Sequence, residues 1–489
     1  MKIVIIGAGI SGCTAYLALK KHLPRPSPPA EDHSYTIYEA HNTDKDTTCS
    51  DRSFADGHSS TLVVGGGLGI GPNGLNVLRR LDEELLRDVV RGGYATAHHY
   101  MKNKHGRVLV RMNSQAAQKS RTNGDKKAPL MNLVACSRHS LWRSLRTRIP
   151  DEIIVNKRVS EVVANPDGRN LVRFADGSPP IEADLVIGAD GVKSTVKRAL
   201  FPEMTNPYPH HYEGLVGIGG FIPISEDLRK HIDKGSMNFV FGGNGFFGYF
   251  YSNSSPSDPN RDSAYHVSEP GDSIAWWSTY SLDEPPADPK AIDREDVTRQ
   301  LRERHSRWKD PVVKKIIHSG VQIDSVYPTW TSPELPTWER DGVVLVGDAA
   351  HALPPTSGQG SSQALEDVEA LTLFLAHYLR QAYRAPLATQ IQTEKQAIKT
   401  AAKQYVALRQ PHVKKILDNA RRMQDRKRNM SVVEEYIMYA VMWIIGFFPS
   451  IMTKSLLAVF EYNIAEEVER ILRREQQQEE EGTAKQQQQ

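Results

Sequence analysis

The chain contains 489 residues, which is too long for one ordinary domain and suits two or three. Hydrophobic residues make up 39% and charged residues 24%, so enough apolar material is present for a core. Because 61 basic residues nearly balance 58 acidic ones, the formal net charge is only +3, which leaves no electrostatic footprint for nucleic acid. The three cysteines, Cys13, Cys49 and Cys136, exclude a disulfide scaffold and have no metal-ligand spacing. We therefore expect a cytoplasmic protein without a metal or a nucleic acid partner.

The N-terminal residues predict a nucleotide-binding turn. Lys2–Ile6 is a continuous apolar run, typical of a strand buried in a parallel sheet, and a helical pattern begins at Cys13. Between them lie Gly7, Gly9 and Gly12, in the pattern G-x-G-x-x-G. In such a motif one glycine allows a tight turn, one lets the backbone approach a pyrophosphate, and one lets the helix pack on the strand. A glycine turn of purely structural use is the alternative.

A second predicted strand ends in an acidic residue. Tyr35–Tyr38 is followed by Glu39, which stands where a carboxylate would bind ribose hydroxyls. The distance from Gly12 exceeds the usual spacing of roughly 20 residues, and the proline-rich stretch 24–29 accounts for the excess.

The middle of the chain, about 212–280, predicts an antiparallel sheet. Met237–Phe241, Phe246–Tyr251 and Ile274–Tyr280 are short runs rich in aromatic and β-branched residues, and a helical stretch follows over Arg294–Gly320. The family resemblance described below makes six aromatic residues of this sheet candidates to line a substrate pocket, although period-two alternation would send half of them into the core of the sheet. They are Phe246, Phe247, Tyr249, Tyr251, Trp276 and Trp277.

A second candidate site lies far along the chain. The apolar strand Gly342–Val346 leads into Gly347-Asp348, and glycines at 358 and 360 then open a helix at Ser361. Asp348 is placed to accept hydrogen bonds from sugar-alcohol hydroxyls, and a helix beginning at Gly360 and Ser361 offers positive partial charge to an anionic ring. A simple turn cap is the alternative for Asp348, and His351 is better explained as a structural turn residue than as a base.

The C-terminal region is predicted to be helical from about Pro386 to Arg474, and the Gln- and Glu-rich residues 475–489 to be disordered. Within it, Tyr436–Thr453 is eighteen residues long and has no charged side chain. A packed helix hairpin, docking on a membrane surface and a membrane span are all open for this segment. Basic residues before it, including Arg421 and Arg422, fit lipid headgroups and equally a solvated helix face.

These motifs resemble those of the single-component flavin monooxygenases, the aromatic-hydroxylase and salicylate-hydroxylase-like family, over nearly the whole chain. The resemblance is strongest to fungal members that serve secondary metabolism. It assigns FAD contacts to the two glycine and aspartate sites above and to Asp190 in an Asp-Gly motif. Gly65, in a glycine-rich segment, and Arg138, which opens a predicted helix, also match the family, with a flexible loop and a surface arginine as the alternatives.

The resemblance implies an α/β fold: a Rossmann-like FAD-binding domain with an inserted antiparallel β-sheet substrate domain and C-terminal helices. The expected division is 1–205 and 335–385 for the FAD-binding domain, 206–334 for the substrate domain, 386–474 for the helices and 475–489 for the tail. It implies FAD as cofactor, NADPH or NADH as electron donor, and hydroxylation or epoxidation of a small, largely apolar substrate by O2. A related dehydrogenase or reductase, or a flavin-binding interaction module, is the alternative.

Two positions depart from the family pattern. Lys197 replaces an arginine of the Asp-Gly motif, which weakens any specific assignment of nicotinamide contacts. Gly219 stands where many relatives carry an arginine that helps to bind or activate a phenolic substrate. Its absence argues against a phenolate-oriented mechanism, and no catalytic base is assigned.

Overall fold

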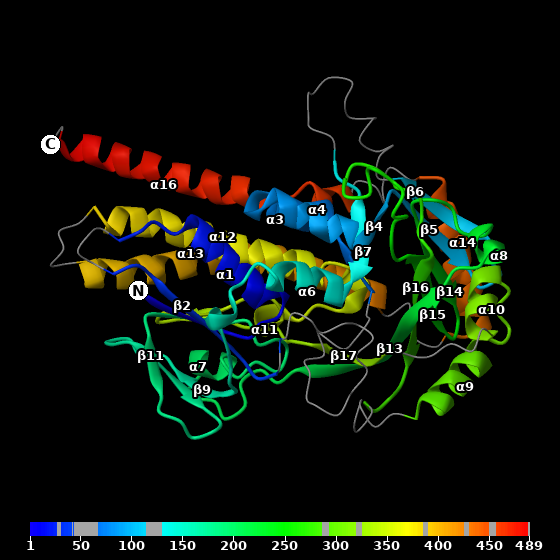
Figure 1. Ribbon diagram of the computed structural model, residues 1–489, viewed down its shortest axis with the longest axis horizontal. Helices are drawn as coiled ribbons and strands as arrows, with labels where there is room; N and C mark the ends of the chain where they lie inside the picture. Colours follow the sequence, from blue (N-terminus) through cyan, green and yellow to red (C-terminus); the bar gives the residue numbers. More distant parts are fainter. Residues whose placement is uncertain are drawn as a thin grey trace.

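The computed structural model describes residues 1–26, 31–41, 43, 67–113, 130–285, 293–318, 325–384, 390–424, 430–448 and 456–487. Figure 1 shows two β-rich regions joined by a small central sheet, with long helices along one of them. The predicted α/β class, with an additional sheet beside the nucleotide-binding region, is confirmed.

A six-stranded, mostly parallel sheet forms the first region. Its order is β18-β19-β12-β1-β2-β8, and only the edge strand β18 runs antiparallel. The central strands are buried along almost their whole length, as their continuous apolar sequences predict. The strands are β1 (Lys2–Ile6), β2 (Ser34–Glu39), β8 (Ile154–Asn156), β12 (Leu185–Gly188), β18 (Glu339–Arg340) and β19 (Val343–Leu345).

Helices pack on one side of this sheet, and a three-stranded sheet lies on the opposite side (Figure 1). The helices are α1 (Ile10–His22), α3 (Pro72–Leu81), α4 (Glu83–Arg91), α6 (Arg138–Arg146), α12 (Gly360–Ala382) and α13 (Gln390–Gln424). The small sheet consists of β9 (Val159–Val163), β10 (Asn170–Phe174) and β11 (Ile181–Ala183), beside the short helix α7 (Lys197–Leu200).

A seven-stranded sheet forms the second region, in the order β17-β13-β16-β15-β14-β5-β6. All its neighbouring strands are antiparallel except β14 and β5. Two of its strands, β5 (His98–Asn103) and β6 (Val108–Asn113), precede the predicted substrate domain in the chain, so the sheet extends beyond residues 206–334. The others are β13 (His211–Pro223), β14 (Ser236–Gly242), β15 (Gly245–Tyr251), β16 (Ser273–Ser281) and β17 (Ser325–Thr331).

A short sheet, β3-β7-β4, lies between the two regions. It consists of β3 (Gly67–Ile70), β4 (Gly93–Thr96) and β7 (Leu133–Ser137). The far face of the seven-stranded sheet is covered by α8 (Glu226–Arg229), α9 (Arg294–His305) and α10 (Pro311–His318). The predicted helical stretch Arg294–Gly320 is thus two helices, since Pro311 starts a new helix and the Asp310 carboxylate accepts from its first N–H groups.

The C-terminal region is helical, as predicted, through α13, α14 (Val432–Gly446) and α16 (Ile464–Gln487). The prediction of disorder from residue 475 onward is wrong as far as Gln487, because α16 continues through it. Gln and Glu are good helix formers, and Glu475 accepts a hydrogen bond from the Tyr378 hydroxyl of α12 at 2.6 Å. Among the described residues, no helix is long and apolar enough to cross a membrane.

Candidate FAD site

The three glycines of the first motif have three different environments. Gly7 has φ +102°, and a Cβ there would lie 2.4 Å from the carbonyl oxygen of Ala189. A Cβ on Gly12 would lie 1.8 Å from the carbonyl oxygen of Gly7, so α1 packs directly on the turn. A Cβ on Gly9 would meet no atom within 4 Å. Gly7 thus serves the turn, Gly12 serves packing, and Gly9 borders open space at the start of α1, where a pyrophosphate would approach.

Glu39 lies beside this turn because β2 pairs with β1 in parallel register. Its carboxylate accepts from the backbone N–H of Ala8 at 2.7 Å and from that of His41 at 3.0 Å. A carboxylate has further lone pairs, so Glu39 both fixes the turn and keeps acceptor capacity for ribose hydroxyls.

Asp190 lies two residues after the end of β12, the strand on the other side of β1. Its Oδ2 accepts from the backbone N–H groups of Thr195 at 2.6 Å and Val196 at 3.2 Å. Its buried Oδ1 has no hydrogen-bond partner among the described residues. Burial raises the pKa of this carboxyl, although hydrogen bonds from Ser194 and the two backbone groups oppose the shift. Such an orphaned buried acceptor is suited to a ligand hydroxyl.

The Gly-Asp motif meets the glycine motif in space. Gly347 has φ +60°, and a Cβ there would lie 2.4 Å from the Oγ of Ser11, at the start of α1. Asp348 follows at the start of the short helix α11 (Asp348–His351) and is half-buried. Its carboxylate makes no hydrogen bond with any described residue. The turn that bears Asp348 thus passes beside the start of α1.

The start of α12 is also open. A Cβ on Gly360 would meet no atom within 4 Å, and no side chain caps this helix. Ser361 follows it and is half-buried. The next residue, Ser362, is engaged differently, since its Oγ accepts from the backbone N–H of Gly71 at 3.2 Å. The uncapped N–H groups of Gly360 and Ser361 lie at the end of the segment that connects α11 to α12.

Arg138 is the first residue of α6, as predicted, and is half-buried. Leu141 and Leu145, three and seven residues on, are fully buried, which confirms the predicted core face. Trp142 of the same helix donates from Nε1 to the carbonyl oxygen of Ala8 at 2.8 Å, so α6 is fixed to the glycine turn. Gly65 lies outside the described residues.

A buried charge network behind the site escaped the sequence analysis. Arg409 of α13 donates to Asp367 at 2.8 Å and to Glu366 at 2.6 Å, and all three side chains are fully buried. Asp367 also accepts from His351 Nε2 at 2.5 Å and from the backbone N–H of Gly347 at 3.0 Å. The network therefore holds the turn that presents Asp348. The sequence signal that could have predicted this network is the pair of adjacent acidic residues, Glu366 and Asp367, within the apolar helical stretch Ser362–Tyr378.

The carboxylates of this network have opposite pKa shifts. Burial raises the pKa of Glu366 to about 7, with Arg409 and Asn73 opposing the shift. Burial acts in the same sense on Asp367, but the charges of His351 and Arg409 outweigh it and hold its pKa below the usual value. His351, buried against Asp367, has the structural role that the sequence favoured.

The two positions that depart from the family pattern, Lys197 and Gly219, both lie against backbone carbonyl groups. Lys197 is buried and donates to the carbonyl oxygen of Tyr208 at 2.8 Å. Gly219 lies on β13 opposite Trp277 of β16, where a Cβ would lie 2.7 Å from the carbonyl oxygen of Trp276. Neither position presents a guanidinium to the sheet.

The six aromatic candidates divide between the two faces of the seven-stranded sheet. Phe247, Tyr249, Tyr251 and Trp276 belong to the core under α8–α10, so they are not available to a substrate there. Phe246 and Trp277 lie on the opposite face, where the Trp277 ring contacts Phe239, Phe246 and Phe250 with centroid distances of 5.8–6.0 Å. This face meets β3, since a Cβ on Gly67 would lie 3.0 Å from the Phe250 ring.

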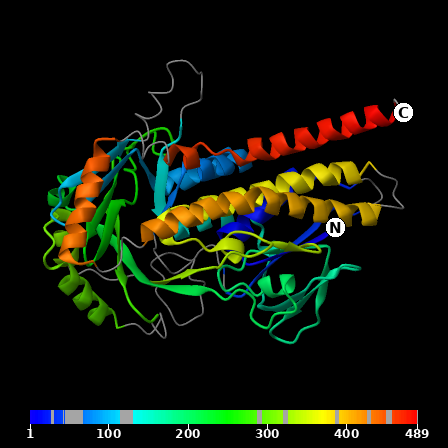
Figure 2. The same cartoon turned by 180° about the vertical axis from the view of Figure 1, so that it is seen from behind.

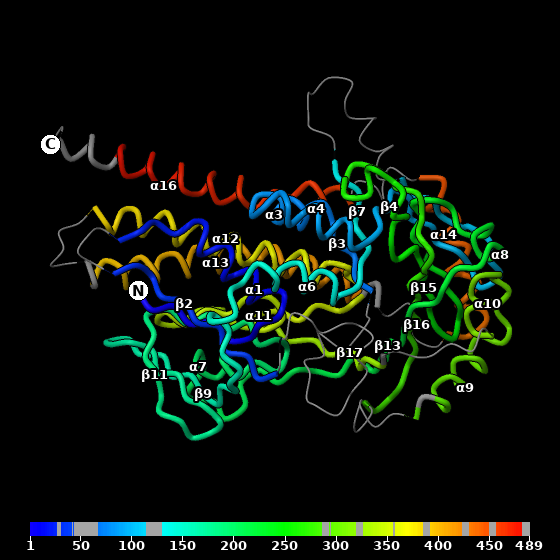
Figure 3. The backbone as a smooth tube through the Cα atoms, in the orientation of Figure 1, coloured from blue at the N-terminus to red at the C-terminus, as the bar shows by residue number. Residues whose placement is uncertain are grey.

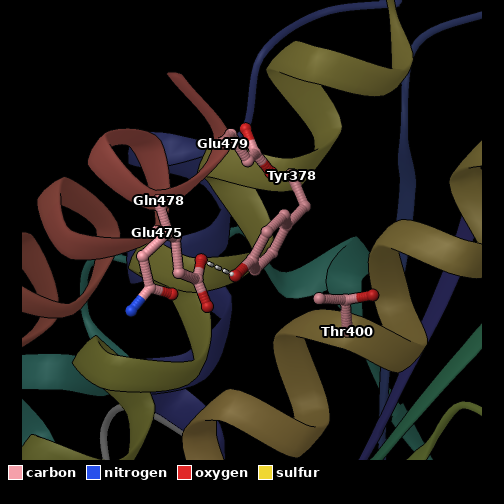
Figure 4. A pocket seen from close by; sticks show the side chains of 5 residues that line it. All are labelled: Tyr378, Thr400, Glu475, Gln478 and Glu479. Atoms are coloured by element: carbon pink, nitrogen blue, oxygen red, sulfur yellow. Dashed lines mark hydrogen bonds between the residues drawn. The ribbon is translucent and has the colours of Figure 1, made fainter. Parts of the chain in front are cut away.

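One open pocket, of about 380 Å³, lies elsewhere, between α12, α13 and α16 (Figure 4). Tyr378, Thr400, Glu475, Gln478 and Glu479 line it, and none of the predicted FAD contacts does so. We therefore do not place a substrate in it. Within the described ranges, no group of three or more His, Cys, Asp or Glu side chains could hold a metal ion.

A glycine turn after a central parallel strand, with acidic residues at or just beyond the ends of nearby strands, is the arrangement of a dinucleotide-binding site. The chain belongs to the FAD binding domain family, whose model matches residues 144–420, more than half of its length. The predicted family and the predicted cofactor, FAD, are thereby confirmed.

Among curated relatives, aurachin C monooxygenase/isomerase of Stigmatella aurantiaca is 28% identical over 46% of this chain. The chain spans about half of that relative, 51% of its length. The 6-hydroxynicotinate 3-monooxygenase of Pseudomonas fluorescens is 24% identical over 80% of this chain and 89% of its own.

Among solved structures, Klebsiella pneumoniae HpxO complexed with FAD and uric acid has a TM-score of 0.67 and 20% sequence identity. The match covers 94% of this chain and 97% of that one, so the two proteins share their fold over nearly their full lengths.

Proposed function

We propose that the protein is an FAD-dependent monooxygenase that uses NADPH or NADH and O2 to hydroxylate or epoxidise a small, largely apolar organic molecule, in secondary metabolism. The observation that carries the proposal is the close approach of Gly347 to Ser11, which places the turn that bears Asp348 beside the start of α1. The monooxygenase relatives support the reaction type.

The proposed contacts to FAD follow from the geometry. The backbone at Gly9 and the start of α1 bind the pyrophosphate, with Gly7 and Gly12 shaping the turn. Glu39 binds the ribose, Asp348 the ribityl chain, and the start of α12 at Gly360 and Ser361 the ring system. We further assign Asp190, Arg138 and Gly65 to FAD contacts. Bound FAD supplies the redox chemistry, and the protein positions the substrate and excludes water.

The substrate site is proposed on the face of the seven-stranded sheet that carries Trp277. This face is aromatic, and the Trp277 indole lies directly against the backbone of Gly248, where a Cβ would lie 2.2 Å from the ring. Without an arginine at 219, this surface favours an apolar molecule over a phenolate. The residues that would act as acid or base stay unassigned.

We also propose the domain division at residues 205, 334, 385 and 474 stated above, with β5 and β6 added to the substrate sheet. A dehydrogenase or reductase with the same cofactor is the second candidate function, because the FAD contacts alone do not distinguish it.

The test begins with the absorption spectrum of the purified protein. Failure to carry flavin, together with failure to take it up on reconstitution, refutes the proposal. NADPH and NADH oxidation and O2 uptake are then measured with aromatic, polyketide and terpenoid compounds. Incorporation of label from isotopic O2 into product supports an oxygenase, whereas peroxide alone indicates the dehydrogenase or reductase.

A further inference from the structure

Helix α14 is apolar on all sides although it lies on the surface. Its charged side chains are confined to Glu434 and Glu435 in the first turn, and none follows through Phe448. Figures 1 and 2 show α14 at the outer end of the seven-stranded sheet; in Figure 2 it is the orange helix at the left edge. A helix that is apolar all round is ordinarily buried or lies in lipid.

The inner face of α14 is firmly attached to the sheet. Met438, Tyr439 and Met442 pack against residues of β6, β14 and β15. The Tyr439 hydroxyl lies 2.7 Å from the carbonyl oxygen of Phe241, and Glu435 pairs with Lys104 at 2.7 Å. These contacts fix the rotation of the helix, so the side chains on its outer face have no core to enter.

The outer face forms a continuous apolar stripe, which we call the α14 stripe. Its members have 43–70% of their surface exposed and account for nine of the fourteen exposed large hydrophobic residues of the described chain. They are Val432, Val433, Tyr436, Ile437, Val441, Trp443, Ile444, Phe447 and Phe448. An exposed apolar patch of this extent marks an interaction surface.

The charges around the stripe point to the kind of partner. Of the two acidic residues in α14, Glu435 is buried in its ion pair and Glu434 accepts from the backbone N–H of Ser431 in a capping box. Lys309 is exposed and lies beside the same end of the helix, since its backbone N–H donates to Lys104. Just before α14, the sequence Arg421–Asn429 contains five basic residues and one acidic residue.

We propose that the α14 stripe docks on the surface of an anionic lipid bilayer, with the helix parallel to the membrane plane. Apolar and aromatic side chains, with Trp and Tyr among them, would enter the boundary between headgroups and acyl chains. Lys309, beside its N-terminal end, and the exposed Arg421 and Arg422 at the end of α13 would meet anionic headgroups. A second copy of the chain fits less well, because a symmetric contact would bring the same positive charges together.

The stripe also adjoins the proposed substrate face. Phe246 and Trp277 pack in the same cluster as Met438, Tyr439 and Met442, so one helix contacts lipid outside and the aromatic face inside. A membrane-dissolved apolar substrate would thus have a short route to the sheet. This last step rests on the proposed function, whereas the docking itself does not.

The test uses the full-length protein with bound FAD and flotation with vesicles of phosphatidylcholine alone or mixed with phosphatidylserine. The wild type is expected to float with the mixed vesicles. The double variant Ile437→Glu/Ile444→Glu should bind at least about 100-fold more weakly, since burial of each isoleucine is worth about a factor of ten or more. The control Val155→Glu/Val163→Glu, on exposed valines of β8 and β9, should bind like the wild type.

Quenching of Trp443 fluorescence by brominated lipid, lost in Trp443→Phe, would place the stripe in the bilayer. A wild type that binds neither vesicle, or a double variant that binds unchanged, overturns the proposal. So does a dimer in light scattering that the double variant abolishes, because the stripe would then be covered by a second copy. The flavin spectrum and NADPH oxidation without vesicles report separately on the proposed function.

Discussion

Removing the guanidinium of Arg409 tests whether the buried network holds the Gly-Asp turn. In Arg409→Met, most of the aliphatic stem is retained while both carboxylates lose their shared partner. Breaking a buried ion pair in this way costs about 3–5 kcal/mol. Asp367 keeps His351 and the backbone N–H of Gly347, and Glu366 keeps Asn73 at 2.5 Å. We therefore expect a loss near the lower limit, about 3 kcal/mol at pH 8.

The loss should depend on pH through Glu366. Burial raises the folded-state pKa of Glu366 from 4.5 to about 7, so its contribution is fully present below pH 4.5 and is lost as the pH rises through 7. Without the positive charge of Arg409, ionisation of the Glu366 carboxyl is less favourable, so its pKa should rise further. The free energy of unfolding of Arg409→Met should thus fall more steeply from pH 6 to pH 8 than that of the wild type.

Urea unfolding at pH 6 and pH 8, followed by tryptophan and flavin fluorescence, measures both effects. Arg422→Met is the matched control, because Arg422 is an exposed residue on the same helix and should change stability by no more than about 0.5 kcal/mol. Adding Glu366→Gln to Arg409→Met should recover part of the loss. The reasoning is refuted if Arg409→Met is no less stable than Arg422→Met.

Three further comparisons test individual parts of the structure. Gly9→Ala should leave the stability of the cofactor-free protein unchanged but weaken FAD binding at least about tenfold, whereas Gly12→Ala should lower the stability itself. Thermal unfolding and FAD titration measure the two quantities, and equal effects of the two variants would contradict this assignment. Glu39→Gln should weaken FAD binding by about 10- to 100-fold, because a hydrogen bond to a charged acceptor is worth about 1.5–3 kcal/mol. An FAD affinity that is unchanged by flavin fluorescence would exclude Glu39 as a ribose ligand. Trp276→Ala should cost about 3–5 kcal/mol in urea unfolding and the half-buried Trp277→Ala less, with the reverse order counting against the assignment of the two sheet faces.

The elements whose sequences carry a strong local signal were predicted well. The run Lys2–Ile6 and the glycines after it form a strand and a turn, because an apolar β-branched run and glycine conformations act within a few residues. Asp190 and Asp348 follow strands as expected, and the Oδ1 of Asp190 has no hydrogen-bond partner among the described residues.

The near-neutral charge and the low cysteine count argued against a nucleic-acid-binding protein and a disulfide scaffold. The glycine and aspartate motifs then indicated the flavin monooxygenase family. The sequence alone determined that a strand, a glycine turn and a helix lie at residues 2–22 and that a turn with an aspartate follows another strand about 340 residues later. Only the tertiary structure decided that Gly347 touches Ser11, that Arg409 joins Glu366 and Asp367 across two helices, and which aromatic residues face away from the core.

The same division holds for the uncharged segment near the C-terminus. Its composition predicts that it avoids water, but not which side chains would be covered. Packing of Met438, Tyr439 and Met442 on the sheet used one face of α14 and left the other exposed. Local propensity acts over a single turn or strand, whereas partner choice depends on which distant surfaces the whole chain brings together.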